Sequence, residues 1–312
     1  MEQVIDLRLP FPSSRKDAVD KLKMMFASSS SNGIANYRNI YGPRLAGNLG
    51  MSLEELQLKT ETLIQRGAED ELAEIAEPLS ISLEDYFNQL DEADVESGLI
   101  LSQDTQRTAN LIARYPDRLK GLIIIDPNEG DPAKNVEHAI KELGFSAVYA
   151  SALHLNMEAD DPRFFPIYAK TQELQIPVVI YTSMNFNTDM RWDIGHPRYI
   201  DAVARAFPHL KIIATCGGWP WVNEMVALAR RHQNLYIDTC SHRPKHLATP
   251  GSGWEMLLQF ANTLLQDRMV FSSGVGDIGL PLSQIVQEVR DLPLKEDVKR
   301  KWLYSNAAEL FG

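Results

Sequence analysis

Eight short apolar runs recur along this 312-residue chain, and most of the segments between them have the periodicity of amphipathic helices. Short apolar runs bounded by turn residues indicate strands, whereas apolar residues at every third or fourth position indicate helices. The expected strands are residues 4–9, 97–102, 120–126, 145–151, 177–182, 211–215, 234–239 and 268–273. Eight strands that alternate with helices predict an α/β fold, a (β/α)8 TIM barrel with right-handed crossovers.

An open doubly wound sheet is the alternative fold. It is disfavoured because no glycine-rich phosphate fingerprint follows the first strand, where that fold usually has one. The expected helices are residues 108–119, 133–144, 163–175, 198–210, 221–233 and 254–267. Because barrel enzymes place their chemistry at the carboxyl ends of the strands, we look for function there.

Residues 12–94 interrupt the alternation of strands and helices. A serine-rich stretch is followed by two helical patterns, residues 52–67 and 82–93, and each pattern opens on a Ser N-cap. We therefore expect one domain, residues 1–312, with a helical insertion after strand 1. Such an insertion would lie over the C-terminal face, where it would cover an active site or contact another subunit, unless it serves packing alone.

The charge of the chain excludes several classes of partner. The net charge of -11 disfavours nucleic acid and anionic membrane surfaces, which bind clustered Lys and Arg. No apolar run approaches the roughly 18 residues of a membrane span, and the N-terminus lacks the pattern of a signal peptide. Cys216 and Cys240 are too few for a disulfide framework. We expect a cytoplasmic protein with free thiols and no membrane partner.

The first expected strand carries charges among apolar residues. Alternation would place Asp6 and Arg8 on one face and Ile5, Leu7 and Leu9 on the other. No histidine stands at the end of an expected strand, and the chain has no His-x-His pair. A zinc site built from imidazoles therefore has no evident ligands.

The chain resembles the amidohydrolase-related (amidohydrolase 2) family of TIM barrels in four long segments, which are residues 160–180, 196–214, 217–238 and 299–312. That family includes aromatic and muconate-type decarboxylases, hydratases and hydrolases. The resemblance covers nearly the whole chain. It implies the barrel fold and a hydrolase or lyase activity on a small molecule.

The chain departs from this family at the metal ligands. Metal-dependent members carry Ile-Asp-x-His-x-His at the end of strand 1, where this chain has Arg8 and Pro10 in the two histidine positions. Tyr181 and Thr215 replace histidines after strands 5 and 6, and Gly274 replaces an aspartate after strand 8. We therefore expect an enzyme that works with no metal and no cofactor. A non-catalytic pseudoenzyme that only binds a ligand is the alternative.

The catalytic residues that we predict are Arg8, Tyr181 and His196. A fixed guanidinium and a tyrosine hydroxyl can hold a carboxylate or an oxyanion, which is part of what a metal would do. His196, in a loop before a helix, is the first candidate for acid and base. The alternatives are a buried ion pair of Arg8 with Asp6 or another barrel carboxylate, plain filling of the barrel by Tyr181, and a solvated surface position for the histidine.

The substrate-binding residues that we predict are Asp6, His154, Trp219, Trp221, His242 and Arg243. Two glycines precede the tryptophans and allow close approach of a ligand to the backbone. His154 and His242 follow strands 4 and 7 and are further acid–base candidates, and Arg243 would bind an anionic group.

An energy estimate limits the substrate. Two oxyanion donors and one general base supply about 10 kcal/mol, which is near the lower end of enzymatic accelerations. An activated substrate such as a β-dicarbonyl, a β-ketoacyl thioester or a lactone is therefore favoured. The segments DIGHPRYID, GGWPW and YIDTCSHRPK also resemble 4-hydroxyphenyl-β-ketoacyl-CoA hydrolases.

That narrower resemblance implies cleavage of a C–C bond in an aromatic β-ketoacyl thioester. A decarboxylase or a lactonase that acts on an aromatic or muconate-type acid is the alternative. The expected partner is a small aromatic acid or an acyl-CoA. We also expect a homo-oligomer.

Overall fold

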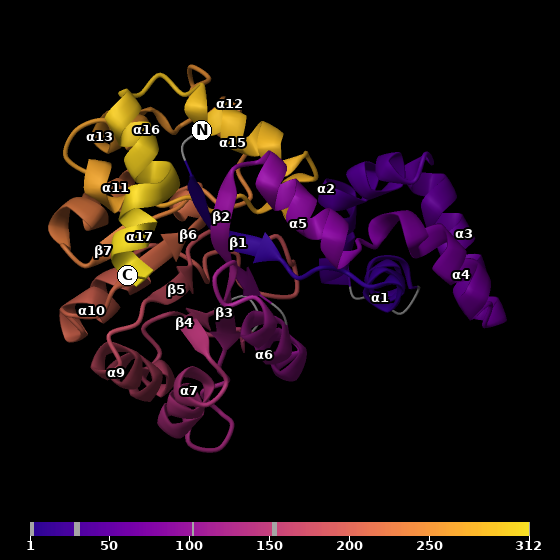
Figure 1. Cartoon of the computed structure of the whole chain (residues 1–312), viewed down its shortest axis with the longest axis horizontal. Coiled ribbons are helices and arrows are strands. Elements are labelled where there is room, and N and C mark those ends of the chain that lie inside the picture. The colour runs from indigo at the N-terminus through magenta and orange to yellow at the C-terminus, as the bar shows by residue number, and fades with distance from the viewer. Residues whose placement is uncertain (1–2, 28–31, 102, 152–154, 312) are drawn as a thin grey trace. The chain divides into compact units, whose positions relative to one another are not determined.

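The computed structural model describes residues 3–27, 32–101, 103–151 and 155–311, and a seven-stranded parallel sheet forms its centre. The strands are β1 (Val4–Pro10), β2 (Val95–Leu101), β3 (Leu119–Ile124), β4 (Phe145–Ala150), β5 (Val178–Tyr181), β6 (Ile212–Thr215) and β7 (Leu235–Ile237). They follow one another across the sheet in chain order (Figure 1). Seven of the eight expected strands are thus confirmed.

The eighth expected strand lies between β7 and β1 but forms no regular ladder. The amide of Val270 donates to the carbonyl of Ile237 at 3.0 Å, and the amide of Leu7 donates to the carbonyl of Phe271 at 2.9 Å. This segment therefore joins the two edges of the sheet and closes the barrel. The predicted TIM-barrel fold is confirmed.

The prediction of a regular eighth strand is wrong, and the reason is a side chain. Beyond Phe271, the amide of Ser273 donates to the Asp6 carboxylate at 2.9 Å rather than to a neighbouring backbone carbonyl. Ser272 likewise donates its hydroxyl to Asp238. The polar groups of this segment are used on buried carboxylates instead of a ladder.

The barrel interior is apolar, and helices surround the sheet. Leu7, Leu99, Leu122, Val179 and Ile213 meet there in one buried cluster, together with residues of the last helix. The helices of this unit are α6 (Thr105–Arg114), α7 (Pro132–Lys141), α9 (Phe165–Glu173), α10 (Arg198–Ala206), α11 (Val222–Arg231), α12 (Pro244–Leu247), α13 (Glu255–Ala261), α14 (Val275–Ile278), α15 (Leu282–Arg290), α16 (Glu296–Arg300) and α17 (Asn306–Phe311). Residues of the strands and of the last helix thus pack into the same apolar core.

Residues 12–89 and 185–192 form a second compact unit, which is largely helical. Its helices are α1 (Arg15–Phe26), α2 (Asn32–Asn48), α3 (Leu53–Arg66), α4 (Glu69–Ala76) and most of α5 (Leu83–Glu92). The unit has its own apolar cluster, in which Leu22, Phe26 and Leu56 are fully buried. The mainly helical character matches the pattern predicted over residues 12–94. Its place over the C-terminal face stays a prediction.

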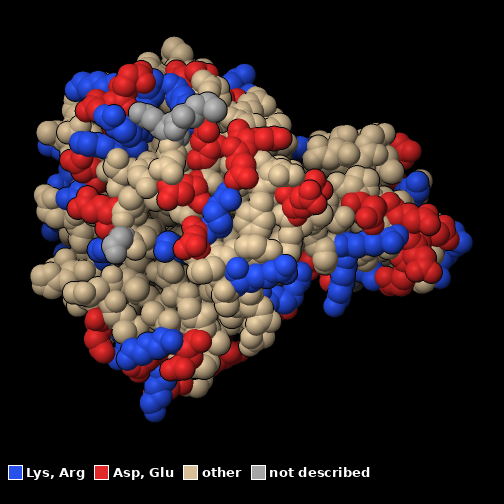
Figure 2. All heavy atoms as spheres, in the orientation of Figure 1, with Lys and Arg blue, Asp and Glu red and all other residues tan. Residues whose placement is uncertain are grey.

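Charges of both signs are mixed on the surface. Figure 2 shows Lys and Arg side chains interspersed with Asp and Glu over the viewed face. No helix in the described part of the chain is both long and apolar enough to cross a membrane.

The closure of the barrel depends on the start of α17. The buried Asn306 amide donates to the carbonyls of Gln266 at 2.9 Å and Met269 at 2.7 Å. We expect Asn306→Ala to lower the free energy of unfolding by about 1–3 kcal/mol, because two buried carbonyls lose their donor. Urea unfolding measures this. Asn110→Ala, at an exposed position on α6, should stay within about 0.5 kcal/mol of the wild type. Equal effects of the two changes would contradict the assignment.

Candidate active site

A break in the pairing of β1 turns Arg8 into the barrel. The register between β1 and β2 shifts between Asp6 and Leu9. Leu7 belongs to the interior cluster, and the guanidinium of the next residue, Arg8, lies over the ring of Tyr149 from the same cluster, 4.9 Å from its centroid. A bulge of this kind re-aims a side chain, and bulges are common beside active sites. The simple alternation predicted for this strand is therefore wrong.

The Arg8 guanidinium has no hydrogen-bond acceptor and no carboxylate partner among the described residues. Burial lowers the pKa of Arg8, but the ionisable groups of Tyr149, Cys240, Asp277 and Cys216 raise it by more, so the pKa lies above the usual arginine value. The positive charge of Arg8 is therefore permanent. The side chain is only partly buried, so its donors are reachable from solvent. Five N–H donors in a planar fork suit a carboxylate or an oxyanion.

Tyr149 forms the floor under this guanidinium. Its side chain is 2% exposed, and burial raises its pKa to about 12. The ring is therefore neutral at physiological pH and offers its π face to the cation.

Asp277, in α14, is held by the Ser241 hydroxyl, which donates to its carboxylate at 2.6 Å.

The buried Asp238 carboxylate organises the neighbouring strand ends. One of its oxygens, Oδ1, accepts from the Thr215 hydroxyl at 2.9 Å, from the Cys216 amide at 3.0 Å and from the Cys240 amide at 2.8 Å. The other oxygen accepts from the Ser272 hydroxyl at 2.7 Å. Burial raises the pKa of Asp238, and the four donors act against that rise. The ends of β6 and β7 and the eighth segment thus share one acceptor.

Asp6 is fully buried and only half satisfied. Its Oδ1 accepts from the amides of Arg8 and Ser273, both at 2.9 Å, whereas Oδ2 has no partner among the described residues. Burial raises the pKa of Asp6 from 3.8 to about 6, against the effect of these donors. Asp6 and Arg8 form no ion pair, so the alternative of a buried Asp6–Arg8 pair is wrong.

The residues in the family's ligand positions do not suit a divalent metal ion. Arg8 places a fixed positive charge in the first of those positions, and the Thr215 hydroxyl is bonded to Asp238. At Gly274, any Cβ would lie 2.6 Å from the backbone nitrogen of Ser241, so this backbone has no room for a ligand side chain. Within the described ranges, no cluster of three or more His, Cys, Asp or Glu side chains is arranged to hold a metal ion.

His242 lies among aromatic rings near this region. Its imidazole is 5.7 Å from the Trp219 ring and 4.8 Å from the Trp254 ring, measured between centroids. Burial lowers the pKa of His242 to about 4. A neutral ring with so low a pKa is a weak base at neutral pH. Trp254 also packs on Gly217, where a Cβ would lie 2.5 Å from its ring.

Arg243 is committed to a structural partner. Its guanidinium forms a bidentate ion pair with Glu288 of α15, in which Nε donates to the carboxylate at 2.8 Å. Both donor groups of the fork are used on this pair. Binding of a substrate anion by Arg243 therefore stays a prediction.

His196 and Trp221 form a separate contact at the start of α10 and α11. The rings lie 4.3 Å apart, and the His196 Nε2 is 3.3 Å from the Glu224 carboxylate. Burial lowers the pKa of His196, partly against the effect of Glu224. No contact among the described residues joins His196 to Arg8, so its catalytic role stays a prediction.

Tyr181 packs on the interior cluster, as the barrel-filling alternative expects. Its hydroxyl donates to the carbonyl of Met184 at 2.8 Å. In this arrangement the hydroxyl offers a ligand an acceptor rather than a donor. His154, the remaining predicted binding residue, lies outside the described residues.

The predictions from sequence missed Tyr149, Asp238 and Asp277 as members of this site. All three stand at or just after the carboxyl end of a barrel segment, and that position was the available signal. Arg8 is distant in the sequence from Tyr149, as are most of the partners of Asp238 from Asp238, so the sequence alone did not rank these residues.

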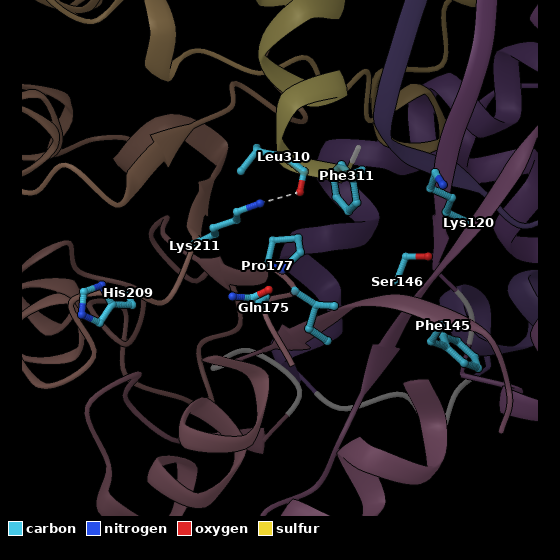
Figure 3. Close-up of a pocket in the computed structure, with 10 residues that line it drawn as sticks. Lys120, Phe145, Ser146, Gln175, Pro177, His209, Lys211, Leu310 and Phe311 are labelled. Carbon is cyan, nitrogen blue, oxygen red and sulfur yellow. Dashed lines mark hydrogen bonds between the residues drawn. The ribbon is translucent and has the colours of Figure 1, made fainter. Parts of the chain in front are cut away.

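A cavity of about 530 Å³ lies elsewhere in the barrel unit. Figure 3 shows Ser146, Pro177 and Lys211 around it, with the Lys211 ammonium bonded to the carbonyl of Leu310. These residues stand at the amino ends of strands or beside α17, whereas Arg8 and Asp238 stand at carboxyl ends. This cavity is therefore at the opposite end of the barrel from the Arg8 site.

Comparisons with known proteins agree with the barrel fold. The family model described as Amidohydrolase matches residues 66–312. Among solved structures, an uncharacterised TIM-barrel protein from Bordetella bronchiseptica is 24% identical, with a TM-score of 0.69 over 99% of this chain and 98% of that one. The 5-carboxyvanillate decarboxylase of Sphingomonas paucimobilis is 17% identical, with a TM-score of 0.64 over 100% of this chain and 99% of that one.

A probable 2-pyrone-4,6-dicarboxylic acid hydrolase from Acinetobacter baumannii, solved with citric acid bound, is 15% identical. Its TM-score is 0.56, over 75% of this chain and 90% of that one. At these identities the structural likenesses establish the barrel fold.

The raised pKa of Asp6 makes a prediction for stability. Because the native state holds this proton more tightly than the unfolded chain, the stabilisation is full below about pH 4 and is lost as pH rises through about 6. The loss is on the order of 3 kcal/mol. We expect Asp6→Asn, which carries no charge at any pH, to flatten the profile of unfolding free energy in this range.

Urea unfolding between pH 4 and pH 8 measures both proteins. Asp70→Asn, at an exposed position on α4, is the matched control and should keep the wild-type slope. An Asp6→Asn profile as steep as that of the wild type would refute the assignment.

Proposed function

This chain belongs to the amidohydrolase family of enzymes, and we propose that it is a metal-independent hydrolase that cleaves a C–C bond in an activated aromatic β-ketoacyl or β-dicarbonyl substrate. The Arg8 guanidinium is the fixed positive charge of its active site. The proposal rests on one observation above the others. The Arg8 guanidinium lies over the Tyr149 ring, its donors have no acceptor among the described residues, and by the resemblance seen in the sequence it occupies a position where metal-dependent relatives carry a histidine.

A cation in this position needs an anionic partner. The neighbours of Arg8 favour its charge but accept none of its hydrogen bonds, and groups with strongly shifted pKa values are frequent at ligand sites. The floor of Tyr149 favours a cation by its π face but satisfies none of the five N–H donors. A carboxylate or a developing oxyanion supplies the missing acceptors in the fork geometry that guanidinium prefers.

In the proposed reaction, water gives a proton to a base as its oxygen adds to the ketone carbon of the substrate, so that a tetrahedral oxyanion forms, and this proton is returned to the enolate in the last step. Arg8 holds this oxyanion, which is worth about 3–4 kcal/mol for a well-placed donor in a buried site. The bond between the former ketone carbon and the α-carbon then breaks, and its electron pair moves into an enolate of the acyl group. Protonation of that enolate gives an acyl thioester, and the other product is an aromatic acid.

A decarboxylase is the second candidate. The 5-carboxyvanillate decarboxylase shares the fold, and an aromatic carboxylate would also bind the Arg8 fork. In that reaction the positive charge of Arg8 would stabilise the substrate carboxylate before the reaction as well as the negative charge that develops in the transition state. Such uniform binding raises affinity without raising the rate of the chemical step. The C–C hydrolase therefore fits a lone fixed cation better.

The first test is a screen for turnover in the presence of excess chelator. We expect benzoylacetyl-CoA or its 4-hydroxy analogue to yield an aromatic acid and acetyl-CoA, and a reaction in water labelled with heavy oxygen should place the label in the aromatic acid. Mass spectrometry of the products measures both. Carbon dioxide release from an aromatic acid without label in the product would establish the decarboxylase instead. Activity that chelator abolishes and zinc or manganese restores would overturn metal independence.

The second test removes the guanidinium. We expect Arg8→Met to lower kcat about 100- to 1,000-fold, because the oxyanion loses its main donor. Arg8→Lys should recover part of the rate, since it keeps the charge but loses the fork. Arg114→Met is the matched control, because Arg114 also lies over an aromatic ring, that of Tyr115, at an exposed position. A rate that Arg8→Met leaves unchanged would refute the role of Arg8.

A further inference from the structure

We propose that Cys216 and Cys240 are a modification site, a buried dithiol that a peroxide oxidises to an intramolecular disulfide at the wall of the Arg8 site. The two residues are the only cysteines of the chain. They follow β6 and β7, which are adjacent strands, and both are free thiols in this structure.

The backbone holds the two cysteines together. Their amides donate to the same atom, Asp238 Oδ1, at 3.0 Å and 2.8 Å. One oxygen accepts two donors only when the donor nitrogens lie close to each other, and a disulfide requires Cα atoms about 4.4–6.8 Å apart. The shared acceptor keeps the two amide nitrogens no farther apart than the sum of these two distances, which is compatible with the spacing of a disulfide.

The side chains also meet. An interaction with the Cys216 side chain, together with burial, raises the pKa of the Cys240 thiol well above its usual value. Cys216 adopts a left-handed backbone conformation, with φ at 67°, which is uncommon for a residue with a side chain. A Cβ at Gly274 would lie 3.0 Å from the Cys240 Sγ, so glycine leaves space for that sulfur.

The position next to Arg8 bears on how an oxidant reaches the cysteine pair and on what its oxidation would change. The Cys216 side chain is 9% exposed, and the charge of Arg8 acts on both sulfurs. Arg8 is only partly buried, and we expect hydrogen peroxide to approach the pair from its exposed side. A disulfide would draw both sulfurs toward each other and would change the charge environment of the guanidinium.

The chemistry balances with hydrogen peroxide as the oxidant. One thiol loses its proton, and its sulfur attacks the O–O bond, so that a sulfenic acid and a water molecule form. The second thiol attacks the sulfenic sulfur, its proton leaves with the hydroxide, and a disulfide and a second water form. The two sulfurs are oxidised, and the peroxide oxygens are reduced. Because both thiols are buried and the pKa of Cys240 is raised, we expect a slow reaction.

The experiment uses the full chain and follows its mass under native conditions. After treatment with hydrogen peroxide, we expect the intact protein to lose the mass of two hydrogen atoms, both thiols to stop reacting with an alkylating probe after unfolding, and dithiothreitol to reverse both changes. Cys216→Ala and Cys240→Ala should each prevent the loss. A gain of oxygen atoms without a disulfide, a covalent dimer on a non-reducing gel, or oxidation only in urea would overturn the proposal.

The effect on the Arg8 site rests on the proposed function and is measured separately. We expect the oxidised protein to turn over an aroylacetyl thioester at least tenfold more slowly than the reduced protein, with recovery in dithiothreitol. The mass measurement stands whether or not that substrate is turned over. A disulfide that leaves turnover unchanged would refute the coupling to Arg8, while the absence of turnover in the reduced protein would count against the proposed function.

Discussion

The arrangement of the strand ends at the carboxyl-terminal face of this barrel depends on the hydrogen bonds that the Asp238 carboxylate accepts. A buried carboxylate is costly unless its lone pairs are bonded, and here four donors from three neighbouring segments bond them. Without it, the amides of Cys216 and Cys240 would be buried without an acceptor. The same carboxylate that stabilises β6 and β7 therefore also positions the groups around Arg8.

Arg8 and Asp6 contrast with this satisfied centre. Most buried polar groups in native proteins have partners, so an exception is informative. The guanidinium of Arg8 has no acceptor among the described residues, and one oxygen of Asp6 has no donor, although the two residues are near neighbours in the chain. The bulge in β1 explains why they do not pair, because it turns Arg8 inward while Asp6 stays with the backbone of the eighth segment. A buried oxygen without a donor, such as that of Asp6, and a cation without an acceptor are both expected at functional sites.

The sequence predicted the barrel well and the site only in part. Apolar runs located seven strands because buried parallel strands need continuous apolar residues, and the loss of the family's histidines was visible directly. The irregular eighth segment was missed because its amide and hydroxyl bond to Asp6 and Asp238, which are far away in the sequence. The pairing of Arg243 with Glu288 was missed for the same reason. Contacts between distant residues leave no local pattern.

The described histidines limit how protons move in the proposed reaction. Burial lowers the pKa of both His196 and His242, so neither ring carries charge at neutral pH, and His242 is a weak base. A site with one strong electrostatic group and histidines of lowered pKa suits a substrate whose leaving carbanion is already stabilised. The enolate of a thioester is such a leaving group, whereas the amine of a peptide requires a strong general acid. Weak proton handling and the fixed charge of Arg8 thus lead to the same substrate class, an activated β-dicarbonyl compound.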